Sequence, residues 1–263
     1  MARAERENTE NSGKVSITVI GSGGCWPTRE RLGPGLVVDA AGPRLLLDCG
    51  PDCLHGLSRA GIPHQSITVV LVSHFHPDHT LGLAHLLFAE RYQLAPRTGK
   101  LLLAGPTGLS GLIEGFRRLY PRWLEPRGFE LEILELGMGK REFPGWTLEV
   151  GRARHRPESL AYRVEAVGRS LLYTGDTAYA ENLADLGRGV DLFVAEASFP
   201  EEAAVAGHLT PVQAGRLARE AGAGRLLLTH LSPLCREKIV REQARAEFSG
   251  EVIVADDGIK LTV

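Results

Sequence analysis

The segment SHFHPDHTLG, residues 73–82, largely decides how this chain folds and which chemistry it carries. It directly follows ITVVLV (67–72), a continuous β-branched run that is typical of a strand buried on both faces. In extended backbone, His74 and His76 point to the same side. Pro77 cannot lie in a helix interior, so we expect a loop here, with Asp78 and His79 entering a helix that runs to about residue 94.

Four side chains of this segment are candidate metal ligands: His74, His76, Asp78 and His79. Neutral imidazoles at the end of a buried strand are most often metal ligands, and the alternative is a His-rich surface turn. Four donors this close together exceed what one tetrahedral ion takes from a short loop, so the spacing favours two neighbouring ions. Imidazole and carboxylate donors suit Zn²⁺ best, with Mn²⁺ or Fe²⁺ as alternatives.

Three further candidates each lie at or near the end of an expected strand. His155 follows the strand that contains WTLEV, Asp176 lies in YTGDT, and His230 lies in LLLTHLS. Taken alone, His155 and His230 are explained equally well as structural residues, and Asp176 as an ordinary turn residue. Together with residues 73–82 they supply the missing ligands, so we expect the fold to bring them to one place.

The remaining pattern predicts two packed sheets covered by helices. Expected strands are 15–20, 36–38, 45–48, 67–72, 101–104, 129–136, 146–150, 160–167, 170–175, 192–195, 225–229, 251–255 and 259–263; expected helices are 54–60, 79–94, 107–120, 210–221 and 236–248. Strands in both halves, with helices after each half, predict an α/β fold, a four-layer αββα sandwich of two mixed β-sheets flanked by helices. Since no repeat or long linker interrupts the chain, we expect a disordered tail over 1–14 and a single domain over 15–263.

Composition excludes several classes of protein. The 263 residues are 43% hydrophobic and 24% charged, the balance of a soluble globular protein. A formal net charge of −2 removes any global electrostatic case for binding nucleic acid or acidic membranes, and no apolar run approaches the roughly 20 residues that span a bilayer. The four cysteines are too few for a disulfide scaffold, which favours a reduced, cytoplasmic protein and leaves their roles open; they are Cys25, Cys49, Cys53 and Cys235.

SHFHPDHTLG, His155, YTGDT and LLTHLS together resemble the metallo-β-lactamase superfamily, and more narrowly its ribonuclease Z branch. ITVIGSGGCWPTRERLGPGLVV (17–38), LLLDCG (45–50) and AEASFPEEAAVAGHLTPVQAGRLA (195–218) fit that branch, so the likeness covers roughly residues 15–255. The resemblance implies two metal sites that share one bridging ligand. One ion would be held by His74, His76 and His155, the other by Asp78, His79 and His230, with Asp176 bridging both.

The resemblance also implies a mechanism in which a metal-bridging hydroxide attacks phosphorus or a carbonyl carbon. In that mechanism Asp78 both binds metal and orients or deprotonates the nucleophile. Glu196 and His208 resemble the paired HEAT and HST motifs of ribonuclease Z, which assist proton donation to the leaving oxygen. Ala195 replaces the first His of HEAT and Leu209 replaces the Ser of HST. The alternative is that Glu196 ends a strand and His208 caps a helix.

Two other residues or segments are expected near the site. Asp48 in LLLDCG matches a family Asp that supports the ligands, and a plain strand-terminal turn is the alternative. The glycines of GSGG (21–24) fail the spacing of dinucleotide and P-loop motifs, so we expect a tight turn near the site rim.

The implied function is that of a dimetal-dependent hydrolase, a phosphodiesterase or ribonuclease Z-like nuclease that acts on a small phosphodiester or an RNA 3′ end. Family analogy adds a homodimer, and the composition predicts no membrane partner. The basic, Gly-rich arm that clamps tRNA in ribonuclease Z is not evident, because residues 122–146 are few and of mixed charge. Alternatives are a hydrolase of a lactone, thioester or β-lactam, or a non-catalytic metal-binding module; the pair Glu196 and His208 favours phosphodiesters.

Overall fold

The computed structural model describes residues 14–26, 28–92, 97 and 99–263. The expected tail over 1–14 lies outside these residues, apart from Lys14, and so does the end of the helix expected over 79–94.

Two seven-stranded sheets form the centre of the described chain. The first sheet contains β1 (Val15–Gly21), β2 (Gly35–Ala40), β3 (Arg44–Leu47), β4 (Val69–Leu71), β5 (Leu101–Gly105), β6 (Leu131–Glu135) and β14 (Lys260–Thr262). The second contains β7 (Gly139–Phe143), β8 (Trp146–Arg152), β9 (Leu160–Ala166), β10 (Arg169–Tyr173), β11 (Leu192–Glu196), β12 (Arg225–Thr229) and β13 (Glu251–Val254).

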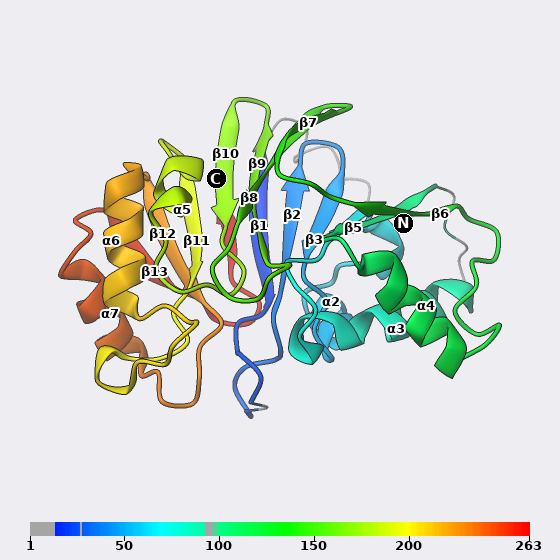
Figure 1. Cartoon of the computed structure of the whole chain (residues 1–263), viewed down its shortest axis with the longest axis horizontal. Coiled ribbons are helices and arrows are strands. Elements are labelled where there is room, and N and C mark those ends of the chain that lie inside the picture. Colours follow the sequence, from blue (N-terminus) through cyan, green and yellow to red (C-terminus); the bar gives the residue numbers. More distant parts are fainter. Residues whose placement is uncertain (1–13, 27, 93–96, 98) are drawn as a thin grey trace.

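Helices cover the outer face of each sheet (Figure 1). The first sheet is covered by α2 (Cys53–Arg59), α3 (Pro77–Arg91) and α4 (Leu109–Leu119), and the second by α5 (Glu181–Leu186), α6 (Pro211–Ala221) and α7 (Glu237–Arg245). Short 3₁₀ helices η1 (His64–Ser66) and η2 (Glu201–Ala203) lie in connecting segments. The predicted four-layer αββα sandwich is confirmed. None of the helices in the described residues combines the length and apolar character that a bilayer crossing needs.

The two sheets have matching topologies. In the first, β14, β1, β2 and β3 pair antiparallel, and β3, β4, β5 and β6 pair parallel. In the second, β7 to β10 pair antiparallel and β10 to β13 pair parallel. Both sheets are therefore mixed, as expected. Neighbouring parallel strands end at the same edge of a sheet, so the loops that follow them can share one site.

The largest apolar cluster fills the space between the sheets. It joins Ile17 and Leu47 of the first sheet to Leu148, Tyr162 and Val194 of the second, all at most a few per cent exposed. Separate clusters lie beneath the helices on each outer face. Both halves of the chain therefore contribute side chains to this one core.

One strand and one α-helix were not predicted, like the short 3₁₀ helices η1 and η2, and both lack a sequence signal. β7 (Gly139–Phe143) is exposed over its first four residues and carries consecutive charges, so no apolar alternation marks it. Such polarity is typical of an edge strand, and β7 lies at the end of the second sheet. α5 has six residues and no side-chain cap at its start. A helix this short shows neither a capping motif nor a full apolar period.

Candidate metal centre

The segment after β4 presents its four candidate ligands from a loop and the first turn of a helix. His76 caps α3 with extended backbone, φ −60° and ψ 146°, and Pro77 is the first helical residue. His74 therefore precedes the helix, while Asp78 and His79 lie in its first turn, as predicted. The imidazoles of His74 and His79 are 4.2 Å apart between ring centroids.

The other three candidates come from loops that follow strands of the second sheet. His155 lies three residues after β8, and Asp176 three residues after β10. His230 directly follows β12 and has a left-handed backbone, φ 59°, which turns it out of the strand direction. Gly175 permits the close approach of YTGDT to the first sheet. Its φ is 56°, and a Cβ there would lie 2.7 Å from Cβ of Ser73.

All seven candidate ligands meet at the edge where these strands end. Their donor atoms form two groups, one from His74, His76, His155 and Asp176 and the other from Asp78, His79 and His230. Within each group, the donor atoms, one per residue, all lie within 4.8 Å of one another. Asp176, His208 and His230 satisfy the same distance. The first two groups coincide with the two ligand sets that the resemblance implies.

Asp176 stands between the two groups and turns one oxygen to each. Its Oδ2 lies 3.8 Å from Nε2 of His74 and 4.0 Å from Nε2 of His155. Its Oδ1 lies 3.4 Å from Nε2 of His79 and 3.4 Å from Nε2 of His230. A carboxylate in this place can contact two cations at once.

The orientation of the imidazoles indicates that the site is built for cations. Nδ1 of His79 donates to Asp48, and Nδ1 of His155 donates to the carbonyl oxygen of Gly207 at 3.0 Å. When these imidazoles are neutral, their Nε2 atoms carry lone pairs, and these atoms point towards the other candidate ligands. Nε2 of His79 lies 3.1 Å from Nε2 of His230, and Nε2 of His155 lies 3.2 Å from Nδ1 of His76. Facing lone pairs repel one another, and a positive charge beside them removes the repulsion.

Two buried polar atoms and two pKa shifts agree with this interpretation. Nε2 of His74 and Oδ1 of Asp176 are buried without a hydrogen-bond partner, which is costly unless a cation contacts them. Burial, and then the charge of His79, lower the pKa of His74 to about 3, so its imidazole is a neutral donor. Burial lowers the pKa of His79, but the charges of Asp176 and Asp48 outweigh it and raise that pKa well above its usual range, so positive charge is favoured beside these carboxylates, either as a proton or as a bound cation. The donor set therefore fits divalent metal ions.

Asp48 orients His79 of the second group and holds Ser73, the residue before His74. Its backbone is left-handed, with φ 57°, and its buried carboxylate accepts the backbone N–H of Ser73 at 2.6 Å and the Ser73 hydroxyl at 2.7 Å. It also accepts Nδ1–H of His79 at 2.7 Å and the hydroxyl of Tyr173 at 2.7 Å. Contact with a candidate ligand was expected of Asp48, and such contacts orient an imidazole and fix its tautomer.

His230 is oriented by different residues. Its Nδ1 lies 2.7 Å from the hydroxyl of Ser198, which donates to Glu196. Gly24 packs against the His230 ring, and a Cβ on Gly24 would be 3.1 Å from Cε1. GSGG thus lies beside the site as expected, but it is not a tight turn, because Gly23 pairs with Leu231 in a parallel bridge. Leu231, which follows His230 after the end of β12, thus pairs with GSGG and keeps this segment extended.

Glu196 and His208 lie beside the candidate ligands as a hydrogen-bonded pair. Nδ1 of His208 is 3.1 Å from Oε1 of Glu196 and 3.9 Å from Oδ2 of Asp176. Glu196 is buried and also accepts the backbone N–H of Thr177 at 2.6 Å. Burial lowers the pKa of His208, but the hydrogen bond and charge of Glu196 outweigh it and raise the pKa above its usual range. The imidazole is only partly buried, so a substrate can reach it.

Sequence reasoning missed Ser198 and Tyr173. Ser198 follows Glu196 by two positions at the end of β11, so alternation along the strand would have placed it on the same side. Tyr173 ends β10 and donates to Asp48 of the first sheet. No local signal predicts that contact, because it depends on how the two sheets face each other.

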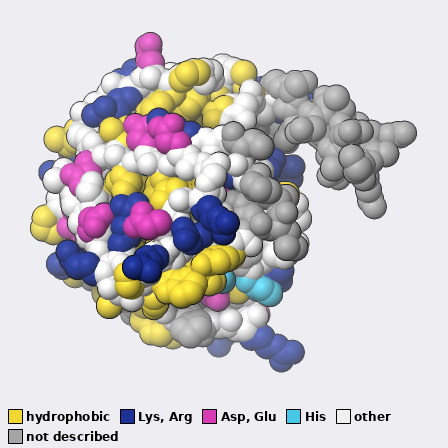
Figure 2. Space-filling view, turned by 90° about the vertical axis from the view of Figure 1, so that its right-hand side faces the viewer, with side chains coloured by type: hydrophobic (Ala, Val, Ile, Leu, Met, Phe, Trp, Pro, Cys, Tyr) yellow, Lys and Arg dark blue, Asp and Glu magenta, His cyan; other side chains and the backbone are white. Residues whose placement is uncertain are grey.

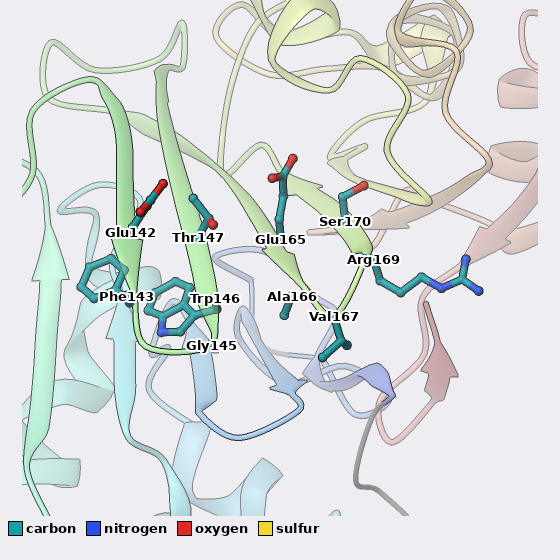
Figure 3. Close-up of a pocket in the computed structure, with 11 residues that line it drawn as sticks. Glu142, Phe143, Gly145, Trp146, Thr147, Glu165, Ala166, Val167, Arg169 and Ser170 are labelled. Atoms are coloured by element: carbon teal, nitrogen blue, oxygen red, sulfur yellow. The ribbon is translucent and has the colours of Figure 1, made fainter.

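A separate hollow of about 500 Å³ lies at the opposite end of β8 and β10 from His155 and Asp176 (Figure 3). Figure 3 shows Glu142, Thr147 and Glu165 side by side on one face of neighbouring strands. Glu165 is already paired with Arg163, at 2.7 Å. This hollow has no His or Cys in its lining and therefore does not compete with the candidate metal centre.

Comparison with known proteins agrees with this geometry. Residues 43–231 match a family model described as a β-lactamase superfamily domain. The chain is 30% identical over 248 residues to the probable metallo-hydrolase YhfI of Bacillus subtilis, covering 93% of this chain and 98% of that protein. The crystal structure of YhfI, a metallo-β-lactamase fold protein, gives a TM-score of 0.83 at 27% identity, covering 95% and 100%. The chain is 31% identical over 280 residues to a ribonuclease Z of Pyrobaculum arsenaticum, covering 92% and 96%.

Proposed function

The chain belongs to the β-lactamase superfamily of metallo-hydrolases, and on this premise we propose that it is a phosphodiesterase of the ribonuclease Z type. It would work with two divalent metal ions, for which Zn²⁺ fits the donors best. We assign one ion to His74, His76 and His155, the other to Asp78, His79 and His230, and a bridging position to Asp176. The split of the Asp176 oxygens between the two groups supports this assignment.

Bound cations would supply Lewis acidity, lowering the pKa of water towards neutrality and offsetting charge on the phosphate. Asp78 is the more accessible of the two carboxylates, with 15% of its side chain exposed against 3% for Asp176. We therefore assign to Asp78 the second role of orienting the nucleophile and accepting its proton. Asp176 is enclosed by imidazoles and serves to hold the centre together.

The observation that carries the choice of phosphodiesters is the pair of Glu196 and His208. Nδ1 of His208 is held by Glu196, which leaves Nε2 free to donate a proton to the leaving oxygen of the substrate. Release of an alkoxide from phosphorus is slow without such a proton donor, and general acid catalysis typically contributes about 10²–10⁴-fold. The 31% identity to a ribonuclease Z supports the same choice.

Small phosphodiesters and RNA 3′ ends are favoured over intact precursor tRNA. The match to ribonuclease Z extends over 280 residues, more than the 263 of this chain, so that relative carries segments which this chain lacks. Residues 122–146 include β6 and β7, with charges of both signs. A clamp that grips RNA through its phosphates needs clustered Lys and Arg.

The test is a parallel assay of metal-loaded protein against bis-p-nitrophenyl phosphate, precursor tRNA, a lactone, a thioester and a β-lactam, with metal content measured on the same sample. We expect turnover of the phosphodiester and little or none of the tRNA. Turnover of a carbonyl substrate alone would replace the proposal with the carbonyl hydrolase. Metal binding without any turnover would favour a non-catalytic module.

We also propose that the protein is a homodimer. Large apolar side chains are exposed on and beside α3 and α4, including Phe88, Tyr120 and Trp123, and they line a groove of about 520 Å³. Figure 2 shows hydrophobic, basic and acidic side chains interspersed on this side of the molecule, a mixture that two copies can match in both signs. Light scattering should give twice the chain mass, and Phe88→Glu should give the monomer.

A further inference from the structure

We propose that Trp26 is a stacking surface for the nucleobase of the substrate, next to the leaving group. This inference rests on the proposed phosphodiesterase function and adds the residue that would bind the base of a nucleotide substrate. Trp26 lies two residues after GSGG (21–24), and its side chain is exposed.

An aromatic path leads from solvent to the proposed proton donor. Trp26 leaves 46% of its surface exposed and meets Phe199 at 5.7 Å between ring centroids, with an interplanar angle of 85°. Phe199 is 8% exposed and meets the His208 ring at 5.7 Å, with an angle of 67°. Edge-to-face contacts of this kind hold rings in defined orientations. The indole is thus two ring contacts away from His208.

The backbone that carries Trp26 is held against the site by hydrogen bonds. Gly24 N donates to the carbonyl oxygen of Leu231 at 3.3 Å, and Leu231 N donates to Ser22 at 2.9 Å. Asp257 accepts both the N–H and the hydroxyl of Ser22, at 2.9 and 2.7 Å. Because Leu231 follows the candidate ligand His230, the position of Trp26 is tied to that of the metal centre.

The side chains of Trp26 and Phe199 fit a nucleobase better than a phosphate. Neither Trp26 nor Phe199 carries a charge, whereas the cations and His208 would bind the phosphate. Because His208 contacts Phe199, we expect a leaving group protonated by His208 to lie on the side of Phe199 and Trp26 and, in a nucleotide substrate, to bring its base towards the indole. Stacking of a base on an exposed aromatic ring tolerates any base, since every base has a π-face. Trp123 is also exposed but packs with Phe88 and Tyr92 beside α4, away from the candidate ligands.

The test compares the affinities of adenosine 5′-monophosphate and ribose 5-phosphate for the full, metal-loaded chain by calorimetry. The two ligands share phosphate and sugar and differ in the base. We expect the nucleotide to bind about 5- to 150-fold more tightly, the range for one stacked base. Trp26→Leu should bring this ratio close to one, Trp26→Phe should keep part of it, and the matched control Trp123→Leu should keep all of it.

The outcomes separate this inference from the function on which it rests. Equal affinities in the wild type, with bis-p-nitrophenyl phosphate still hydrolysed, would overturn the stacking role and leave the phosphodiesterase intact. Failure to bind either ligand, together with no phosphodiester turnover, would overturn both. If Trp26→Leu weakened both ligands equally, the residue would have a structural role only. Thermal unfolding of each variant shows whether the fold is preserved.

Discussion

The two halves of the chain contribute to one site in opposite ways. The N-terminal half places four candidate ligands within six consecutive residues, 74–79, at the end of one strand and the start of one helix. The C-terminal half contributes His155, Asp176, His208 and His230 from four separate loops, each one after a strand of the second sheet. The first set is arranged by local backbone geometry, and the second by the packing of a whole sheet.

This difference predicts how each half responds to change. The two groups proposed to bind the metal ions each contain members from both halves, so neither half forms either of these two groups alone. Within 74–79, a backbone shift would disturb both groups at once, because the loop is shared. In the second half, loss of one loop residue should disturb only the group to which it belongs. Asp176 is the exception, since its two oxygens face both groups.

The largest effect is expected for Asp176→Ala. Both groups lose a shared carboxylate, so metal analysis should show that neither ion is retained at full occupancy. Activity should fall by at least roughly 10⁴-fold, because each 1.4 kcal/mol of lost metal assistance costs a factor of ten and several kcal/mol are lost. Asp185→Ala, an exposed carboxylate on α5 of the same half, is the control and should change neither quantity. Full metal content in Asp176→Ala would show that Asp176 does not bridge the two ions.

His155→Ala and His230→Ala sharpen the comparison, because each should remove mainly one ion. Metal content should fall from about two ions per chain towards one in each variant, with activity reduced roughly 10³-fold by the loss of one Lewis acid. The double variant should lose both ions. His85→Ala, an exposed imidazole on α3, is the control. If either single variant lost both ions, the two groups would form one cooperative site rather than two.

The same contrast explains what sequence reasoning could predict. The 73–82 segment could be interpreted on its own, because spacing, Pro77 and the preceding apolar strand act over a few residues. His155, Asp176 and His230 became candidates only as members of a set at strand ends. That Asp176 turns one oxygen to each group depends on how closely YTGDT approaches Ser73, which no local pattern specifies.

Elements marked by apolar periodicity were predicted, including the hairpin of β2 and β3 and the helix α6. β7 and α5 were missed because an exposed, charged strand and a six-residue helix have no such period. The residues that orient the candidate ligands also divide into those that the sequence predicted and those that it did not. Asp48 was predicted from its place in LLLDCG, whereas Ser198 and Tyr173 were not. Their contacts join residues that are 32 and 125 positions apart.

A smaller effect is expected for His208→Ala, which belongs to the second half but to neither proposed metal set. Cleavage of a diester with an alkoxide leaving group should slow by roughly 10²-fold or more, as for loss of a general acid, with metal content unchanged. The loss should be much smaller with bis-p-nitrophenyl phosphate, because p-nitrophenolate leaves without a proton. Equal losses on both substrates would assign His208 to positioning rather than to proton donation.

The smallest effects separate the residues that orient a ligand in each half. Asp48→Asn removes a carboxylate that accepts four hydrogen bonds, so metal affinity should fall by about 10- to 100-fold, as is typical for loss of an orienting carboxylate. Ser198→Ala removes one hydroxyl between His230 and Glu196 while Gly24 still packs on the His230 ring. A neutral hydrogen bond contributes about 1 kcal/mol, so we expect a loss of about fivefold. Chelator competition measures both affinities on the same scale. If Ser198→Ala lowered metal affinity as much as Asp48→Asn, the ligands of the C-terminal half would depend on their orienting contacts as strongly as the ligands of residues 74–79 do.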